Sequence, residues 1–427
     1  MGNMPKLRTA FTTLTVLLTA ASLKSGSSAQ TPTLTTLHSF AGKPSDGAYP
    51  YAGVTIGSGG VLYGTTISGG GHGPGWNTGD GIVFSLAPPV APGGVWTEAI
   101  YSFSDEIGDR PQAGVAIGSD GILYGTTYHS FTVFALKPPP MEGGQWMQEV
   151  LGGGAPVLIY PEGTLAIGNG GVLYGTSYEG GDTFDEEGDV FSVTPPVPPG
   201  GAWTTTAIRT LSTGSFPESG VAIGGDGVLY GTTSNGNGEV YSLTPPATPG
   251  GTWTETSLHA FAGAPEDGGS PGGAGVVVGT DKVLYGTSFD GGTGTACRNG
   301  CGTVYSLTPP TIPGGAWTEA VLYNFAGADD GQAPTGVVIG PDKVLYGTTS
   351  NGGSGTSCYD GCGTVFSLTP PADPGGPWTE KILHDFTGPD GANPGAGVAL
   401  GTDGGLYGTT VNGGSGTCGC GTVFQLK

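Results

Sequence analysis

The phrase Leu-Tyr-Gly-Thr occurs seven times in this chain of 427 residues, and this repetition constrains the fold more than any other feature. Its tyrosines lie 50 to 61 residues apart, at Tyr63, Tyr124, Tyr174, Tyr230, Tyr285, Tyr346 and Tyr407. Self-similarity at such a period is typical of repeat architectures, in which each unit buries its faces against its neighbours. Seven copies therefore predict seven structural units.

Each repeat contains four short apolar runs, for example at 336–340, 344–349, 363–368 and 378–386. None of these runs is long enough for a typical helix. Turn tetrads containing Asp and Gly separate the first two runs and accept the positive φ of a tight hairpin. A Pro-Pro-x-x-Pro-Gly-Gly segment, which cannot continue a ladder, precedes the fourth run. The pattern predicts a four-stranded antiparallel meander.

Seven such units arranged around a ring form a seven-bladed β-propeller, an all-β fold. An open β-solenoid is the alternative, but its rungs are shorter and it needs distinct caps at both ends, which we do not find. Residues 34–40 resemble a fourth strand without its three predecessors, and residues 421–427 resemble a third strand. We therefore expect the N-terminal strand to complete the last blade and close a single domain spanning 30–427.

The repeated segments also point to a family. The recurring pattern of LYGTT, NGG, GTVFSLTPP, PGG and WTE resembles the secreted tandem repeats called GloVer. The resemblance covers essentially the whole mature chain. It implies a repeated, propeller-like architecture and carries no information about chemistry.

The N-terminus has the features of a secretory signal peptide over residues 1–29. Lys6 and Arg8 precede the apolar run 10–23, and small residues at 27–29 suit cleavage. The mature chain then has nine basic and 34 acidic residues, a net charge of −25. Duplex DNA and anionic membranes are poor partners for such a chain. We expect an acidic, secreted or periplasmic monomer without a membrane span.

All six cysteines lie in the last three repeats, between the second and third runs. An even number of cysteines in a secreted chain favours disulfides, and the predicted pairs are Cys297 with Cys301, Cys358 with Cys362, and Cys418 with Cys420. A thiolate zinc site is the weaker alternative, because three pairs on separate blades would have to converge. The pair separated by one residue is expected to be strained.

Function is expected where the repeats differ, in the loops of one face. The loop between the second and third runs of the first repeat contains His72 and Trp76, and the matching loop of the second repeat contains Tyr128 and His129. An exposed indole or phenol ring can stack on a sugar or a peptide. The alternative is that Trp76 only covers its own long loop.

A second candidate site consists of aspartates in Asp-Gly-x-x-Pro segments before the first strand of four blades. These residues are Asp46, Asp267, Asp330 and Asp390. Carboxylates placed around the channel mouth are able to hold a cation, with Ca²⁺ the candidate ion. The alternative is that each Asp caps its own turn, while Pro stiffens the entry to the strand.

These observations favour a binding or scaffold module whose loop face takes a glycan, a peptide or an extracellular protein. No nucleophile, zinc-protease or phosphate-loop motif is present in the sequence, so we lean against an enzyme. Two alternatives remain open. One is a secreted polysaccharide hydrolase or lyase with carboxylates at the channel mouth, and the other is a structural cell-envelope protein.

Overall fold

The computed structural model describes residues 32–427 apart from short gaps at 72–78, 92, 105–108, 140–143, 154–157, 181–186, 212–214, 249, 313 and 417. Almost all of the predicted signal peptide therefore lies outside the described residues. Among the residues that are described, no helix is both long enough and apolar enough to cross a membrane.

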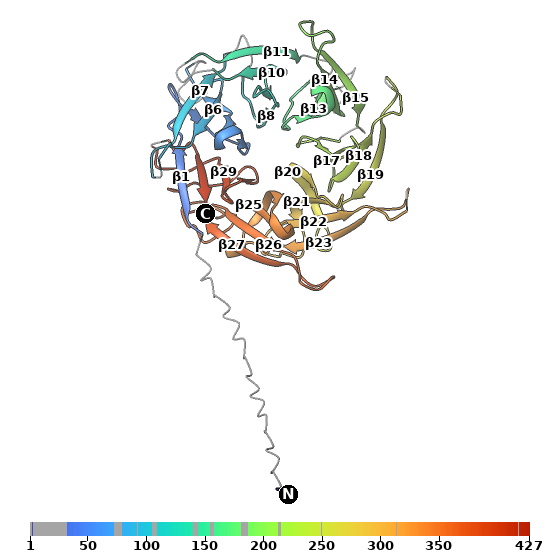
Figure 1. Ribbon diagram of the computed structural model, residues 1–427. Coiled ribbons are helices and arrows are strands. Elements are labelled where there is room, and N and C mark those ends of the chain that lie inside the picture. The colour runs from blue at the N-terminus through green and yellow to red at the C-terminus, as the bar shows by residue number, and fades with distance from the viewer. Residues whose placement is uncertain are drawn as a thin grey trace. The chain divides into compact units, whose positions relative to one another are not determined.

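Seven antiparallel four-stranded sheets follow one another around a ring, which confirms the predicted seven-bladed β-propeller (Figure 1). In order from the inner to the outer strand, blade 1 contains β3 (Thr55–Ile56), β4 (Leu62–Thr66), β6 (Ile82–Ala87) and β7 (Thr97–Ser102), and blade 2 contains β8 (Ala116–Ile117), β9 (Leu123–Thr127), β10 (Thr132–Lys137) and β11 (Met147–Gly153). Blade 3 contains β12 (Ala166–Ile167), β13 (Leu173–Gly180), β14 (Glu187–Thr194) and β15 (Thr204–Thr210), and blade 4 contains β16 (Ala222–Ile223), β17 (Leu229–Thr233), β18 (Glu239–Thr244) and β19 (Thr254–Ala260). Blade 5 contains β20 (Gly268–Val278), β21 (Leu284–Gly291), β22 (Thr303–Thr308) and β23 (Thr318–Asn324), and blade 6 contains β24 (Gln332–Ile339), β25 (Leu345–Asn351), β26 (Thr364–Thr369) and β27 (Thr379–Asp385). Blade 7 contains β28 (Ala399–Leu400), β29 (Leu406–Thr410), β30 (Thr422–Leu426) and β1 (Leu34–Ser39).

Short elements complete the chain path. The turn between the first two strands forms a 3₁₀ helix in three blades, at η1 (Ser58–Gly60), η2 (Asn169–Gly171) and η4 (Pro341–Lys343), and η3 (Ala328–Asp330) lies before β24. The two-residue strands β2 (Gly47–Ala48) and β5 (Ser68–Gly69) pair with each other in a small separate sheet.

Apolar side chains at equivalent positions build the core between the blades. The leucine of each Leu-Tyr-Gly-Thr phrase is buried, and so is the aromatic residue opposite its glycine in the third strand, such as Phe84 and Phe366. The aromatic residue after one fourth strand packs edge-on against the third-strand ring of the next blade. The ring centroids of Phe40 and Phe84 lie 5.2 Å apart, and those of Phe325 and Phe366 lie 5.1 Å apart. Such edge-to-face pairs add to the stabilisation from burial.

The threonine of the phrase connects neighbouring blades near the ring centre. In five blades its buried hydroxyl donates to a main-chain carbonyl in the segment that enters the next blade, as Thr65 does to Ala113 (2.8 Å) and Thr176 to Ser219 (2.7 Å). The same bond runs from Thr409 of blade 7 to Ala52 before blade 1, at 2.8 Å. These bonds satisfy buried hydroxyls that would otherwise destabilise the fold, whereas Thr287 Oγ1 in blade 5 has no hydrogen-bond partner among the described residues.

The ring closes as the two chain ends predicted. Strand β1 pairs antiparallel with β30, with Leu34 opposite Leu426 and Ser39 opposite Thr422. Figure 1 shows the blue β1 beside the red C-terminal strands. The Lys427 amide also donates to the Thr33 carbonyl (3.1 Å). One blade therefore contains both ends of the propeller domain.

The three predicted disulfides are present. Cys297–Cys301, Cys358–Cys362 and Cys418–Cys420 each join residues whose Cα atoms are 5.2 Å apart. They close the loops between the second and third strands of blades 5, 6 and 7. The thiolate metal site that was the alternative is therefore wrong.

Candidate functional site

A cavity of about 480 Å³ lies at the centre of the ring, among the segments that lead into the inner strands. Its described lining residues come from the entries to blades 1, 2, 3, 4, 5 and 7. Each of these entries contains a proline, and the residue immediately after the proline lines the cavity in five blades, as Gly395 in blade 7 and with a side chain in four others. These four residues are Tyr51, Gln112, Glu162 and Glu218. Proline fixes the local backbone, so the same position in successive blades reaches the same place.

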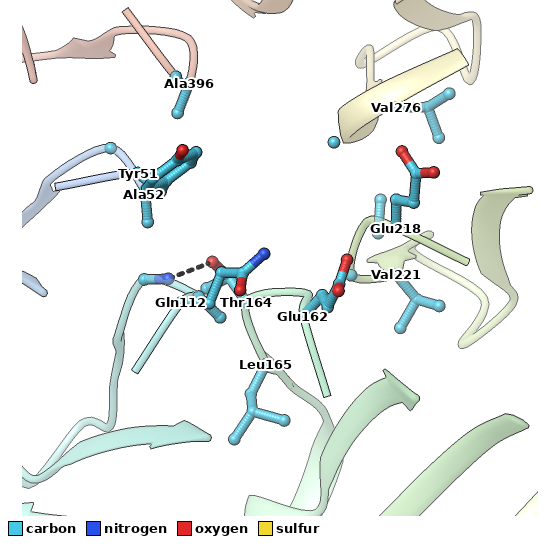
Figure 2. A pocket seen from close by; sticks show the side chains of 17 residues that line it. Tyr51, Ala52, Gln112, Glu162, Thr164, Leu165, Glu218, Val221, Val276 and Ala396 are labelled. Carbon is cyan, nitrogen blue, oxygen red and sulfur yellow. Dashed lines mark hydrogen bonds between the residues drawn. The ribbon is translucent and has the colours of Figure 1, made fainter. Parts of the chain in front are cut away.

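Two of these lining residues are glutamates on neighbouring blades. Glu162 precedes blade 3 and Glu218 precedes blade 4, and Figure 2 shows both carboxylates projecting into the cavity. Burial, together with the negative charge of Glu218, raises the pKa of Glu162 to about 7. Both effects disfavour a second ionised carboxylate in the cavity. Near neutral pH, Glu162 is therefore able both to donate and to accept a hydrogen bond.

The remaining lining is small or uncharged. Gln112 and Thr164 supply polar groups, and the Thr164 hydroxyl accepts a hydrogen bond from the Gly114 amide (3.1 Å). Ala52 and Ala396 lie across the cavity from the glutamates (Figure 2). This asymmetry concentrates the negative charge on the side of the cavity formed by blades 3 and 4.

An aromatic residue lies two positions before each of the two glutamates, and each of these residues packs against a second ring. Tyr160 lies two residues before Glu162, and its ring centroid is 4.7 Å from that of Tyr128 in the loop after β9. Phe216 lies two residues before Glu218 and stacks on Tyr178 of β13, also at 4.7 Å. All four rings are half-buried, so part of each faces solvent. We call these four rings, with Glu162 and Glu218, the aromatic–acid site.

Tyr128 is influenced electrostatically by Glu162. Burial raises the pKa of Tyr128, and the charge of Glu162 is the next largest cause, followed by Tyr160. An electrostatic effect of this kind requires Tyr128 to lie close to Glu162. The Tyr128–Tyr160 pair and Glu162 therefore lie near the junction of blades 2 and 3, and none of the four rings is among the described residues that line the cavity.

The backbone at Tyr160 is held in an uncommon conformation. Its φ is +52°, and Tyr49 and Arg110 have φ of +61° and +52° at the equivalent positions. The left-handed region costs an ordinary residue roughly 1–2 kcal/mol. Hydrogen bonds hold it in place: the Tyr178 amide donates to the Tyr160 carbonyl at 3.0 Å, and the Tyr128 amide donates to the Arg110 carbonyl at 3.1 Å. The same conformation occurs before the entry proline at Ser270, Ala333 and Asn393, so it belongs to the repeat and not to this site alone.

The loop residues singled out from the sequence have different outcomes. Tyr128 belongs to the aromatic–acid site. His129 is exposed, stacks on Tyr128 with centroids 5.7 Å apart, and places Nδ1 3.4 Å from Asp109 Oδ2. His72 and Trp76 lie outside the described residues, so their suggested role stays a prediction.

The four aspartates occupy a different place from the one expected. None of them is among the described residues that line the axial cavity. Each accepts a hydrogen bond from the backbone of its own turn, as Asp46 does from Ala41 N (2.7 Å) and Asp390 does from Thr387 N (2.8 Å). Each also contacts the preceding fourth strand, in the pairs His38–Asp46, His259–Asp267, Tyr323–Asp330 and His384–Asp390. The loop folds back on that strand, and these contacts are the ones that the turn-capping alternative describes.

Sequence reasoning missed Glu162, Glu218 and Tyr160. The sequence does contain a signal for them. When the residues on either side of the entry proline are compared among the repeats, the third and fourth repeats each have an aromatic residue before the proline and a glutamate after it. What the sequence lacked was the information that this position faces the axis.

Solved structures that are similar to the chain share little sequence with it. A fungal alcohol oxidase in complex with copper has a TM-score of 0.54 at 15% identity, with 92% of this chain and 75% of that chain covered. A protein described as a glucose dehydrogenase from Thermus thermophilus has a TM-score of 0.42 at 17% identity, covering 74% and 96%. A protein described as a 6-phosphogluconolactonase from Bacteroides uniformis has a TM-score of 0.47 at 12% identity, covering 76% and 84%. At such low identity, the likeness to the alcohol oxidase shows the fold alone.

Sequence comparison identifies the repeat itself. No curated protein matches the chain. The family model described as the Gloeobacter/Verrucomicrobia repeat matches residues 75–297 and 292–427, which is most of the sequence. The resemblance drawn from the LYGTT and WTE segments is thereby confirmed, and the chain belongs to the Gloeobacter/Verrucomicrobia repeat family.

Proposed function

We propose that this protein is a secreted glycan-binding module whose ligand occupies the aromatic–acid site. The observation that carries the proposal is that two aromatic pairs, Tyr128–Tyr160 and Tyr178–Phe216, involve the segments that lead directly to the two glutamates of the axial cavity. Pyranose rings present flat C–H faces edged with hydroxyl groups. A surface that combines half-exposed rings with hydrogen-bonding groups matches both features.

The carboxylates favour a neutral or amino-bearing glycan. Glu162, with its pKa raised to about 7, supplies a hydrogen-bond donor as well as an acceptor, and Gln112 and Thr164 add further polar groups. An anionic sugar would meet the charge of Glu218 and the net negative charge of the whole chain. The cavity volume, about 480 Å³, lies within the range of small-molecule sites.

Secretion is part of the same proposal. Three disulfides suit an oxidising compartment, because thiols in the cytosol are kept reduced. The apolar segment at 10–23 after two basic residues supports export through a signal peptide.

A glycan array probed with the mature protein tests the proposal. Retention of neutral or amino-bearing glycans is expected, with Y160A and E218Q each weakening the binding at least tenfold. The matched control is F289A, because Phe289 occupies the position of Tyr128 and Tyr178 in blade 5 but has Ala333 in place of the partner ring. Binding that is unchanged in Y160A and E218Q, or equally weakened in F289A, would remove this site from the proposal.

A second candidate function is hydrolysis or elimination on a polysaccharide. It is favoured by the raised pKa of Glu162, because a carboxyl that titrates near 7 suits a general acid beside a second carboxylate. Product analysis on each retained glycan separates the two functions. Turnover that is lost in E162Q while binding persists would favour the enzyme, whereas retention of the intact glycan favours the binding module.

A further inference from the structure

The junctions between blades contain a recurring polar position outside the aromatic–acid site. In each case, a residue near the end of the outer strand of one blade contacts the second residue of the outer strand of the next blade. Three chemistries occur there: Arg209 forms an ion pair with Glu255 at 2.5 Å, Tyr101 donates a hydrogen bond to Gln148, and His38 contacts Glu98 at 3.4 Å. The same backbone position therefore accepts several types of pair.

At two of these junctions, the turn aspartate joins a histidine and a glutamate. His38 of β1, Asp46 and Glu98 of β7 form one group, and His259 of β19, Asp267 and Glu319 of β23 form the other. Within each group, one ligand atom from every residue lies within 4.8 Å of the others. We propose that these two groups are sites for a transition-metal dication of the Zn²⁺ type, one between blades 7 and 1 and one between blades 4 and 5.

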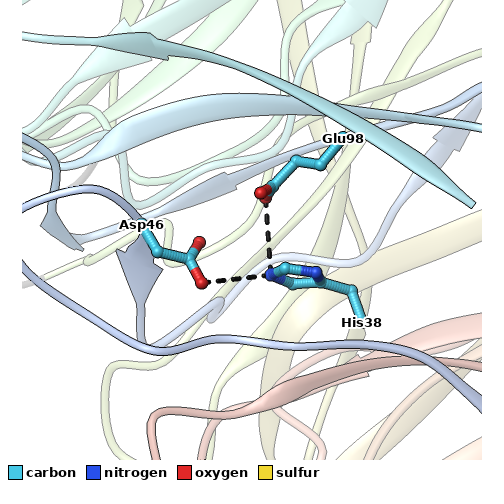
Figure 3. A group of neighbouring side chains, drawn as sticks. All are labelled: His38, Asp46 and Glu98. Atoms are coloured by element: carbon cyan, nitrogen blue, oxygen red, sulfur yellow. Dashed lines mark hydrogen bonds and ion pairs between the residues drawn. The ribbon is translucent and has the colours of Figure 1, made fainter.

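Two donor–donor distances in the first group are close to those around a tetrahedral ion. His38 Nε2 lies 3.2 Å from Asp46 Oδ2 and 3.4 Å from Glu98 Oε1, and Figure 3 shows both carboxylates directed at this nitrogen. Ligands at about 2.0–2.1 Å from a tetrahedral zinc lie roughly 3.3 Å from one another. In the second group, His259 Nε2 lies 3.0 Å from Asp267 Oδ2.

Two further features point to a ligand. Oε1 of Glu98 and Oε1 of Glu319 are buried and accept no hydrogen bond from a described residue, a feature shared by Glu380 Oε1 at the junction between blades 5 and 6, where no histidine is present. A buried carboxylate oxygen without a donor is costly, and coordination to a metal satisfies it. The aspartates are also oriented by their surroundings: Asp46 accepts from Ala41 N and Gly47 N, and Asp267 accepts from Ala262 N and Gly268 N. Outer contacts of this kind hold a ligating carboxylate in place.

The donor set favours zinc over calcium. Imidazole nitrogen with two carboxylate oxygens suits Zn²⁺, whereas Ca²⁺ takes six to eight oxygen ligands. The expectation of Ca²⁺ at Asp46 and Asp267 is thus replaced by a nitrogen-containing site. Three protein ligands leave a fourth position for water.

The chain contains its own matched controls. In the junction between blades 5 and 6, Tyr323 replaces the histidine and donates to Asp330 at 2.7 Å, so the protein itself satisfies that carboxylate. In the junction between blades 6 and 7, His384 contacts Asp390 at 2.9 Å, but Leu34 stands where the glutamate would be. Neither junction has three suitable donors, and neither is proposed to bind a metal.

Calorimetric titration of the untagged, chelator-treated full chain with Zn²⁺ tests the inference, with Co²⁺ absorption as a second readout of coordination. Two ions per chain are expected, one ion in H38Y or H259Y, and none at these sites in the double variant. H384Y should still bind two. Because Tyr already occupies the same position at Tyr101 and Tyr323, these variants should fold, and a thermal melt without metal checks this.

The glutamates give an independent variant should a histidine substitution disturb folding. E98Q and E319Q copy the Gln148 junction and should each lower Zn²⁺ affinity at least tenfold. Saturating Zn²⁺ is expected to raise the melting temperature of the wild-type chain but not of the double histidine variant, and Ca²⁺ is expected to do neither. Zn²⁺ binding that is absent, or that is unchanged in H38Y/H259Y and in E98Q/E319Q, would overturn the inference.

Discussion

Gly125 and Phe134 lie directly opposite each other in blade 2, and a Cβ added to Gly125 would come within 2.5 Å of the Phe134 ring. The same relationship holds for Gly408 and Phe424 in blade 7. The glycine of the repeated phrase therefore makes room for an aromatic ring of its own blade. This ring then reaches the core against the preceding blade, as Phe134 does against Phe103 at 5.2 Å.

We predict that G125A lowers the free energy of unfolding by roughly 1–3 kcal/mol, because overpacking forces the ring or the strand to shift. Urea unfolding followed by circular dichroism measures the change. Gly225 is the control, since a Cβ there meets nothing within 4 Å and its φ is not positive. A G125A variant as stable as G225A would contradict this account of the repeat.

A second prediction concerns closure of the ring by β1. A chain beginning at residue 40 lacks the ladder from Leu34 to Ser39 and leaves β30 as an exposed edge. Its unfolding midpoint should fall, and it should associate with increasing concentration in size-exclusion chromatography. A chain beginning at residue 32 retains β1 and is the control. Equal stability of the two chains would show that the N-terminal strand does not hold the ring closed.

A third prediction concerns pH. Burial and the charge of Glu218 raise the pKa of Glu162 to about 7, above its ordinary value of 4.5. The folded protein therefore holds this proton more tightly than the unfolded chain. The resulting stabilisation is complete below pH 4.5 and is lost as the pH rises through 7.

E162Q removes this titration, so its stability relative to wild type should be greater at pH 8 than at pH 5. Urea unfolding at the two pH values measures the difference, with the exposed E266Q as the control. A relative stability of E162Q that is the same at both pH values would show that Glu162 titrates as an ordinary glutamate.

A fourth prediction concerns the disulfides. Each five-residue loop, such as the one closed by Cys358 and Cys362, should contribute about 2 kcal/mol by the chain-entropy estimate. Blades 1 to 4 contain no cysteine. Reduction should therefore lower the unfolding midpoint while the β-sheet signal in circular dichroism persists. Complete loss of that signal on adding a reductant would mean that the propeller depends on these bonds.

Much of the architecture follows from the sequence alone. Seven blades could be predicted from the seven Leu-Tyr-Gly-Thr phrases and from the four apolar runs that Gly and Pro residues separate in each repeat. Closure of the ring could be predicted from the incomplete repeats at 34–40 and 421–427. The cysteine pairs were also predictable, because each pair lies within one short hairpin loop. These features are local in the chain or recur with its period, so no knowledge of distant contacts was needed.

The candidate sites depended on contacts between blades. Glu162 and Glu218 are far apart in sequence and meet because equivalent positions of adjacent blades converge on the axis. Asp46 was expected at the channel mouth, but its loop folds back to bring it to His38, and the next blade adds Glu98. The sequence by itself determined the repeating unit and the number of copies. Only the tertiary structure decided which side chains from neighbouring copies share one environment, because the curvature of the ring and the direction of each loop set those distances.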